Sequence, residues 1–220
     1  GLLGLEGIGG GGGVGTEGPV CGKGDKVIIS CITACFKCDF CRKQVYSHCR
    51  KGGWILGNTI DGTQADYVRI PYADTSLYPL PPDADEEASI MLSDILPTGF
   101  ECGVLNGRVK PGDSVAIVGA GPVGLSALMT AQLYSPAKII MIDLDDGRLK
   151  VAQSLGATAV VNSSDGKAIE RVMKMTGGNG VDVAIEAVGI PATFDICQGI
   201  PAAGGQQANI GVHGAPVLRH

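Results

Sequence analysis

The 220-residue sequence contains few charged residues, few aromatic residues and no surplus of positive charge. Charged residues make up 18% of the chain and aromatic residues 5%, and the formal net charge is −5. A chain with this charge balance has no electrostatic basis for binding nucleic acid or an anionic membrane, so we expect neither partner. Hydrophobic residues make up 45% of the chain, which is enough for a sizeable buried core.

The sequence also lacks a secretory signal pattern and an uninterrupted apolar stretch long enough to span a membrane. It does not start with the basic and then apolar pattern of a secretory signal, so we expect a cytoplasmic protein. A long apolar stretch, residues 114–137, is interrupted by glycine and proline at positions 119, 121, 122 and 124. This interruption predicts a buried strand, a turn and a buried helix rather than a membrane span.

Glycine, in contrast, is abundant, with 35 residues, five of which are consecutive at positions 9–13. Glycine loses more conformational entropy on ordering than any other residue, so a run of five favours neither a packed strand nor a packed helix. We therefore interpret this run as a flexible loop or as a stretch in which the sequence itself is in error.

Four of the eight cysteines are closely spaced, in the pattern C-x2-C-x2-C-x7-C: Cys35, Cys38, Cys41 and Cys49. Four thiolates can close a tetrahedral shell around one Zn²⁺, and an all-sulfur shell leaves no open position, so such a zinc ion is structural. The alternatives are a redox C-x-x-C motif and a disulfide pair. The tight spacing and the expected reducing compartment favour zinc. We expect the other four cysteines to be small buried apolar residues.

The chain changes character near residues 105–113. Before this point, short strands are predicted at 26–31 and 66–70 between many turns, which is typical of a β-rich domain. Residues 83–105 are predicted to be helical, with Asp83 and Glu86 forming a capping box. We therefore expect a β-rich domain over residues 1–105 and a second domain over residues 106–220.

The second domain alternates apolar segments with helical patterns. Strands are predicted at 114–118, 138–142, 159–161, 181–185 and 208–211. Helices are predicted at 123–134, 146–155, 167–175 and 191–198. This alternation implies an α/β fold with a doubly wound parallel sheet that helices cover on both faces.

A glycine-rich turn lies between the first predicted strand and the first predicted helix of this domain. Residues 119–124 read Gly-Ala-Gly-Pro-Val-Gly, the G-x-G-x-x-G pattern of dinucleotide-binding sites. Gly119 permits the tight turn, Gly121 lets the backbone approach a pyrophosphate, and Gly124 lets the helix pack against the strand. The pyrophosphate then lies on the free amides at the start of the helix, beside Pro122 and Val123.

Asp143 ends the second predicted strand of this domain. A carboxylate at this position binds the ribose hydroxyls and repels a 2′-phosphate, so it predicts NAD in preference to NADP. Arg148 could stack on adenine or bind a phosphate, and an ordinary turn residue is the alternative role for Asp143.

Loops at the carboxyl ends of later strands line the cofactor crevice in such sheets. We therefore expect Val188, Gly189 and Val212 at the nicotinamide end. We interpret Glu186 as a structural hydrogen-bond acceptor near the cofactor rather than a base, and His213 as a packed or solvated residue rather than a catalyst.

A four-cysteine lobe followed by a nucleotide-binding half resembles the zinc-dependent medium-chain dehydrogenases, the alcohol dehydrogenase family. Residues 4–7 (Gly-Leu-Glu-Gly) are similar to the G-H-E-G segment of the family, and residues 23–27 and 110–113 are similar to its strand entry and its linker. Residues 92–99 (Leu-Ser-Asp-Ile-Leu-Pro-Thr-Gly) resemble the stretch that supplies a catalytic-zinc ligand. Asp at the ligand position resembles the bacterial branch that includes secondary-alcohol dehydrogenases. The resemblance covers nearly the whole chain.

This resemblance implies a GroES-like catalytic domain followed by a Rossmann domain, and a catalytic zinc in addition to the structural one. It implies that Asp94 is a zinc ligand, that Glu6 is an exchangeable ligand or a carboxylate beside the metal, and that Thr98 packs near the nicotinamide or the ligands. The His ligand of the family falls at Leu5, and its Cys ligand, sixth Rossmann strand and C-terminal return have no counterpart in these 220 residues. We therefore expect the middle of a longer enzyme, and hypothesise that the parent protein has His at position 5.

The function implied by the resemblance is oxidation of small primary or secondary alcohols to aldehydes or ketones, with hydride transfer to NAD. A polyol or threonine dehydrogenase of the same superfamily is one alternative. A non-catalytic homologue that binds zinc and a nucleotide is another. The resemblance also implies a homodimer or homotetramer, with the four-cysteine lobe near a subunit contact.

Overall fold

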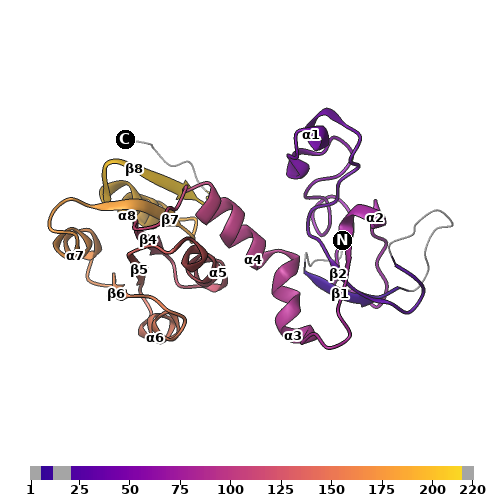
Figure 1. The fold of residues 1–220 in the computed structure, drawn as a ribbon, viewed down its shortest axis with the longest axis horizontal. Coiled ribbons are helices and arrows are strands. Elements are labelled where there is room, and N and C mark those ends of the chain that lie inside the picture. The colour runs from indigo at the N-terminus through magenta and orange to yellow at the C-terminus, as the bar shows by residue number, and fades with distance from the viewer. Residues whose placement is uncertain (1–5, 12–20, 215–220) are drawn as a thin grey trace. The chain divides into compact units, whose positions relative to one another are not determined.

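The computed structural model describes residues 6–11 and 21–214, and the chain forms two compact units (Figure 1). The first unit is Gly1–Asp94 and the second is Ile95–His220. The division therefore precedes the helical residues 95–105, whereas the predicted domain boundary follows them.

A three-stranded antiparallel sheet organises the first unit. It consists of β1 (Gly7–Gly10), β2 (Lys26–Ile29) and β3 (Leu77–Pro79), in the order β1-β2-β3. The central strand contributes three buried side chains, Val27, Ile28 and Ile29. Short helices follow in the loops: α1 (Asp39–Arg42), η1 (Tyr46–His48) and α2 (Ala73–Ser76).

Strand β1 corrects our interpretation of the glycine run. Gly9 and Gly10 are paired with Val27 and Lys26 of β2, so this part of the run is a strand. At Gly7, where β1 begins, a Cβ atom would lie 2.8 Å from Thr63 Cγ2. Side chains of neighbouring segments thus cover the start of β1, whereas a Cβ atom on Gly10, at its end, would meet no described atom within 4 Å. Gly12 and Gly13 lie outside the described residues.

Three other local predictions before residue 106 are wrong. Residues 66–70 form no strand, because a strand needs a ladder partner and this segment has none among the described residues. The helical cap lies at Asp85 rather than at Asp83, since the Asp85 carboxylate accepts a hydrogen bond from Ala88 N at 3.1 Å. The predicted long helix is a series of shorter ones, interrupted at Asp94: α3 (Glu86–Ser89), η2 (Ile90–Ser93), α4 (Ile95–Thr98) and η3 (Gly99–Leu105).

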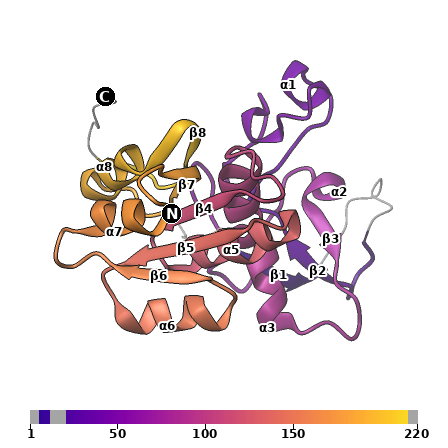
Figure 2. The same cartoon turned by 60° about the vertical axis from the view of Figure 1, so that its left-hand side comes forward.

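The second unit is built on a five-stranded parallel sheet in the order β6-β5-β4-β7-β8 (Figure 2). Its strands are β4 (Ser114–Val118), β5 (Lys138–Asp143), β6 (Ala159–Asn162), β7 (Val181–Glu186) and β8 (Pro201–Asn209). Its helices are α5 (Pro122–Ala131), η4 (Gln132–Tyr134), α6 (Asp146–Ser154), α7 (Ala168–Met175) and α8 (Pro191–Gly199). This confirms the predicted doubly wound fold, although the last strand starts seven residues before its predicted start at 208.

Alternate residues of the central strands pack on opposite faces of this sheet. Ile117, Met141 and Ile185 pack with α5 and α6, whereas Ala116, Ile140 and Ala184 pack with α7 and α8. Burial on both faces is the reason why these strands are continuous apolar runs in the sequence. The chain crosses from one side of β4 to the other between β6 and β7, and such sheets bind ligands at the carboxyl ends of the strands beside this switch point.

Asp182, at the start of β7, ties this strand to the start of β4. Its Oδ2 accepts hydrogen bonds from Ser114 N at 2.8 Å and Ser114 Oγ at 2.7 Å. These hydrogen bonds hold the pKa of Asp182 below its ordinary value. Because the folded-state pKa is the lower one, this stabilisation is present above about pH 4 and is lost as the pH falls through the folded-state pKa.

We therefore expect Asp182→Asn to lower the melting temperature at pH 7, and the difference from wild type to shrink below about pH 4. Thermal unfolding of both proteins between pH 7 and pH 3 measures this. An equal difference at pH 7 and pH 3 would contradict the assignment.

No single helix in the described part of the chain is long and apolar enough to cross a membrane. The helical segments 86–93 and 95–105 reach that length and apolarity only when they are taken together across the break between them.

Candidate functional site

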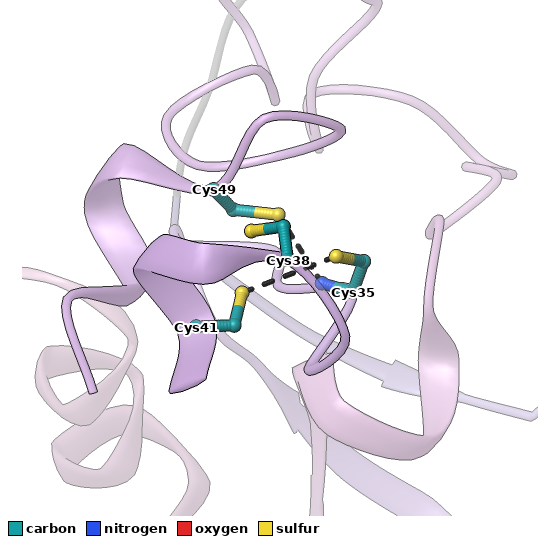
Figure 3. A group of neighbouring side chains, drawn as sticks. All are labelled: Cys35, Cys38, Cys41 and Cys49. Atoms are coloured by element: carbon teal, nitrogen blue, oxygen red, sulfur yellow. Dashed lines mark hydrogen bonds between the residues drawn. The ribbon is translucent and has the colours of Figure 1, made fainter. Parts of the chain in front are cut away.

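The four closely spaced cysteines converge in the first unit (Figure 3). The sulfur atoms of Cys35, Cys38, Cys41 and Cys49 all lie within 4.8 Å of one another, and those of Cys35 and Cys41 are 4.0 Å apart. With Zn–S bonds of about 2.3 Å, the sulfur atoms of a tetrahedral ZnS₄ site are about 3.8 Å apart. The donor set and its spacing therefore fit one zinc ion in a closed, structural site.

Backbone N–H groups surround the sulfur atoms and favour the ionised ligands. Cys35 N donates a hydrogen bond to Cys49 Sγ at 3.3 Å. The N–H groups of Arg50 and Cys41 lower the pKa of Cys38 to about 6, whereas burial raises the pKa of Cys41 to about 12. A metal ion supplies the positive charge that a buried thiolate at Cys41 needs, so metal binding and ionisation of this lobe are coupled.

Aromatic and ionic contacts hold the two ends of the cysteine lobe together. The rings of Phe36 and Tyr46 are stacked with their centroids 4.8 Å apart. Arg50 donates hydrogen bonds of 2.6 and 2.8 Å to the carboxylate of Asp39, and its guanidinium lies 4.9 Å from the centroid of the Phe40 ring. These contacts join Arg50, which follows the last cysteine, to the segment that carries the first three.

The two carboxylates predicted for the catalytic zinc meet at a third residue, Cys31. Burial raises the pKa of the Cys31 thiol to about 12, and the charge of Asp94, a hydrogen bond with its carboxylate and the charge of Glu6 act in the same direction. The backbone fixes this arrangement, because Cys31 N donates to Ser93 O at 3.1 Å and Thr63 Oγ1 donates to Glu6 O at 2.5 Å.

We expected Cys31 to be a small buried apolar residue, and this interpretation missed its polar surroundings. Nothing in the spacing of the sequence links Cys31 to the two acidic residues, since they come from three separate segments. Only the folding of β2 beside these segments brings them together.

The described residues do not complete a catalytic zinc site. Within residues 6–11 and 21–214, the four-cysteine group is the only set of three or more His, Cys, Asp or Glu side chains placed to hold a metal ion. Asp94 and Glu6 therefore do not fit a catalytic zinc by themselves. Leu5, where we expected a histidine in the parent protein, lies outside the described residues, and Thr98 ends α4 in the second unit.

The glycine-rich turn has the geometry of a pyrophosphate site. Gly119 has φ of +104°, which favours glycine, and a Cβ atom on Gly124 would lie 1.8 Å from Gly119 O. Gly121 differs from both, because its Cβ atom would meet no described atom within 4 Å. Pro122 occupies the first turn of α5, and no side chain in the described part of the chain caps this helix end. The first amides of α5 are therefore open to an anion.

Asp143 is hydrogen-bonded to the backbone of this turn. Its Oδ2 accepts a hydrogen bond from Ala120 N at 2.7 Å, and its Oδ1 accepts one from Asp145 N at 2.9 Å. The carboxylate thus shapes the turn and still has lone pairs that can accept hydrogen bonds from ribose hydroxyls. Arg148 lies exposed in the first turn of α6, two residues after this helix begins.

The loops after β7 and β8 meet at the same end of the sheet. A Cβ atom on Gly119 would lie 2.6 Å from Val188 Cγ2, so the loop after β7 packs against the glycine-rich turn. Gly189 has φ of +94°, and a Cβ atom there would lie 2.5 Å from Val212 O, so the two loops touch. The structure therefore brings Val188, Gly189 and Val212 to the carboxyl edge, beside the predicted pyrophosphate site.

Comparison with known proteins covers both halves of the chain. The family model for the alcohol dehydrogenase GroES-like domain matches residues 2–82, and that for the zinc-binding dehydrogenase domain matches residues 122–218. An alcohol dehydrogenase from Cupriavidus necator is 43% identical over 161 residues, which are 73% of this chain and 44% of that protein. A medium chain reductase/dehydrogenase from an Acremonium species is 36% identical over 86% of this chain and 67% of its own length.

Solved structures agree with this match. Zinc-dependent alcohol dehydrogenase 2 from Streptococcus pneumoniae is 59% identical and superposes with a TM-score of 0.94, over 99% of this chain and 62% of that chain. An alcohol dehydrogenase from Thermus is 37% identical, with a TM-score of 0.89, over 97% of this chain and 62% of that chain. The present chain thus spans less than half of the Cupriavidus protein and about three fifths of these two structures. It belongs to the zinc-dependent medium-chain dehydrogenases, the alcohol dehydrogenase family.

Proposed function

We propose that the protein is an NAD-dependent alcohol dehydrogenase that interconverts small primary or secondary alcohols with the matching aldehydes or ketones. The observation that carries this proposal is the hydrogen bond from Ala120 N in the glycine-rich turn to Asp143 Oδ2, at the carboxyl end of a doubly wound sheet. When bound, NAD would supply the hydride acceptor, and the glycine-rich turn, the first amides of α5 and the Asp143 carboxylate would hold and orient it.

The choice of NAD rests on Asp143. A carboxylate that faces the adenosine ribose accepts hydrogen bonds from its hydroxyls and repels a 2′-phosphate. The choice varies among relatives, since an NADP-dependent isopropanol dehydrogenase from Clostridium beijerinckii is 32% identical over 97% of this chain. The proposal therefore needs a direct comparison of the two cofactors.

Zinc has a separate place in the proposal. The four-cysteine site is proposed to hold the structural zinc. Asp94 and Glu6 are proposed to contribute to a catalytic site that the described residues leave incomplete. A homodimer or homotetramer in the cytoplasm, with a small alcohol as the partner, is proposed from the family alone.

The test combines turnover with zinc content. NADH formation is followed with ethanol, 2-propanol, 1-butanol, sorbitol and threonine, each with NAD and with NADP, and zinc per chain is measured by elemental mass spectrometry. Turnover of the simple alcohols with NAD and two zinc ions per chain would support the proposal. Turnover restricted to sorbitol or threonine would replace it with the polyol or threonine alternative. One zinc ion and no turnover with any substrate would favour the non-catalytic alternative.

Replacing Asp143 by serine is expected to weaken NAD⁺ binding about tenfold to a hundredfold and to narrow the gap between NAD⁺ and NADP⁺. The reason is the loss of charged hydrogen bonds to the ribose, each of which contributes about 1.5–3 kcal/mol. Asp146→Ser, at the exposed start of the next helix, is the matched control. Calorimetric dissociation constants for both cofactors measure the effect, and an unchanged ratio in Asp143→Ser would refute the assignment.

A further inference from the structure

Glu186, the last residue of β7, is a fully buried carboxylate that the proposed chemistry does not use. Its Oε1 accepts three hydrogen bonds, from Val188 N at 3.0 Å, Gly189 N at 2.9 Å and Thr193 Oγ1 at 2.7 Å. Three donors on one oxygen satisfy the hydrogen-bonding needs of this buried group. They also tie the loop after β7 to the strand end and to α8.

The second oxygen of this carboxylate is directed toward the loop after β8. Glu186 Oε2 is buried and has no hydrogen-bond partner among the described residues, and His213 Nε2 lies 3.6 Å from it. A Cβ atom on Gly211 would lie 2.3 Å from the same oxygen. The backbone of the second loop therefore lies against the carboxylate, and the Glu186 carbonyl also accepts hydrogen bonds from Ile210 N at 2.8 Å and Gly211 N at 3.2 Å.

His213 is held so that one ring nitrogen faces this oxygen. Its Nε2 lies 3.0 Å from Asn209 Oδ1, and Asn209 Nδ2 donates to Gly211 O at 3.0 Å, which fixes the orientation of the amide. Because the Asn209 Oδ1 acceptor faces the ring, Nε2 carries the proton and donates it to Asn209, and Glu186 Oε2 lies beside the same nitrogen. The ring also meets Phe194 edge-on at 5.4 Å, and its Nδ1 is buried without a partner in the described chain.

Both loops present apolar side chains beside the glycine-rich turn. Val188 and Ile190 flank Gly189 with 45% and 47% exposure, and Val212, next to His213, is 85% exposed. Exposed apolar side chains on two touching loops offer apolar contact to a flat ring bound at this edge of the sheet. Their positions are set by the two loops, and the loops are joined at Glu186 and His213.

We propose that Glu186 and His213 form a positioning pair that holds the loops after β7 and β8 in register against the nicotinamide ring of the bound dinucleotide. This inference rests on the proposed function and adds to it. The pair touches neither substrate nor cofactor. It acts through Val188, Ile190 and Val212, so its loss affects binding of the nicotinamide half far more than binding of the ADP-ribose half.

The test compares two ligands that differ only in the nicotinamide. Dissociation constants of NADH and ADP-ribose are measured by calorimetry for wild type, Glu186→Gln, His213→Phe and the double variant. Glu186→Gln keeps an oxygen for the three donors and places an N–H against His213, and His213→Phe keeps the contact with Phe194. His213→Gln, which restores a polar N–H, is the rescue variant. Asp182→Asn, at the opposite end of the same strand, is the matched control.

We expect each single variant to weaken NADH binding about tenfold and to change ADP-ribose binding less than twofold. We expect the double variant to lose less NADH-binding free energy than the two single variants lose together. Such non-additivity is the signature of a direct interaction between the two residues. His213→Gln should recover most of the affinity. Equal weakening of both ligands, or unchanged NADH binding in both single variants, would overturn the pair. Wild type that binds neither ligand would overturn the proposed function, and the pair with it.

Discussion

Replacing Cys41 by serine is expected to release the zinc from the cysteine lobe and to unfold residues 35–49. Cys41 is buried, and ionisation of its thiol depends on the metal, since burial raises its pKa to about 12. Structural zinc sites contribute roughly 10–16 kcal/mol at pH 7, so each of four ligands accounts for about 3 kcal/mol, which is a hundredfold or more in zinc affinity. The lobe has a small apolar core besides its cysteines, so little else holds it together.

Zinc per chain after dialysis against a chelator, together with the melting temperature, measures this effect. Cys21→Ser is the matched control, because Cys21 is in the same unit but outside the ligand group. The expected result is one zinc ion fewer in Cys41→Ser and an unchanged content in the control. Two results would instead favour the disulfide or redox alternative. One is an unchanged zinc content in Cys41→Ser, and the other is wild-type protein whose lobe cysteines react with a thiol reagent only after reduction.

Replacing Gly124 by alanine is expected to abolish dinucleotide binding and to destabilise the second unit. An added Cβ atom would lie 1.8 Å from Gly119 O, which is backbone and cannot move away without opening the turn. Overpacking of this kind costs about 1–3 kcal/mol or more. The helix amides that would hold the pyrophosphate move with the turn, so we expect NADH affinity to fall by a factor of a hundred or more.

Gly121→Ala separates binding from folding. The added Cβ atom would meet no described atom within 4 Å, and the φ of −79° suits any residue. We therefore expect Gly121→Ala to unfold at the same temperature as wild type. If the pyrophosphate approaches this backbone, the same methyl group blocks it, and NADH binding weakens about tenfold or more. Calorimetric titration and thermal unfolding of both variants measure the contrast. A Gly121→Ala protein that binds NADH as tightly as wild type would place the dinucleotide elsewhere.

Much of the second unit could be predicted from the sequence because its signals are local. The apolar runs at β4, β5 and β7 are buried on both faces of one sheet, so their pattern indicates strands without knowledge of the partners. In the glycine-rich turn, Gly119 has a left-handed φ and Gly124 lies close to the carbonyl oxygen of Gly119. Both positions require glycine, so the turn is recognisable in the sequence. The four cysteines are equally local, since one metal ion needs four donors within a short loop.

The first unit was harder to predict because its elements depend on distant partners. Strand β1 is nearly all glycine, and its pairing with β2 and its contact with Thr63 stabilise it. Residues 66–70, in contrast, have a strand-like composition but pair with no strand among the described residues. Sheet pairing joins residues that are far apart in the chain, so propensity alone does not decide it.

The sequence by itself determined the composition of the sites: four thiols at zinc-binding spacing, a dinucleotide turn after a buried strand, and an acidic residue at the end of the next one. Only the tertiary structure decided which residues meet across the chain. It brought Cys31 to Asp94 and Glu6, bonded Asp143 to the amide of Ala120, and buried Glu186 against His213. The reason is physical. Ligand spacing and turn geometry are properties of a few consecutive residues, whereas burial and hydrogen-bond partners arise when separate segments pack together.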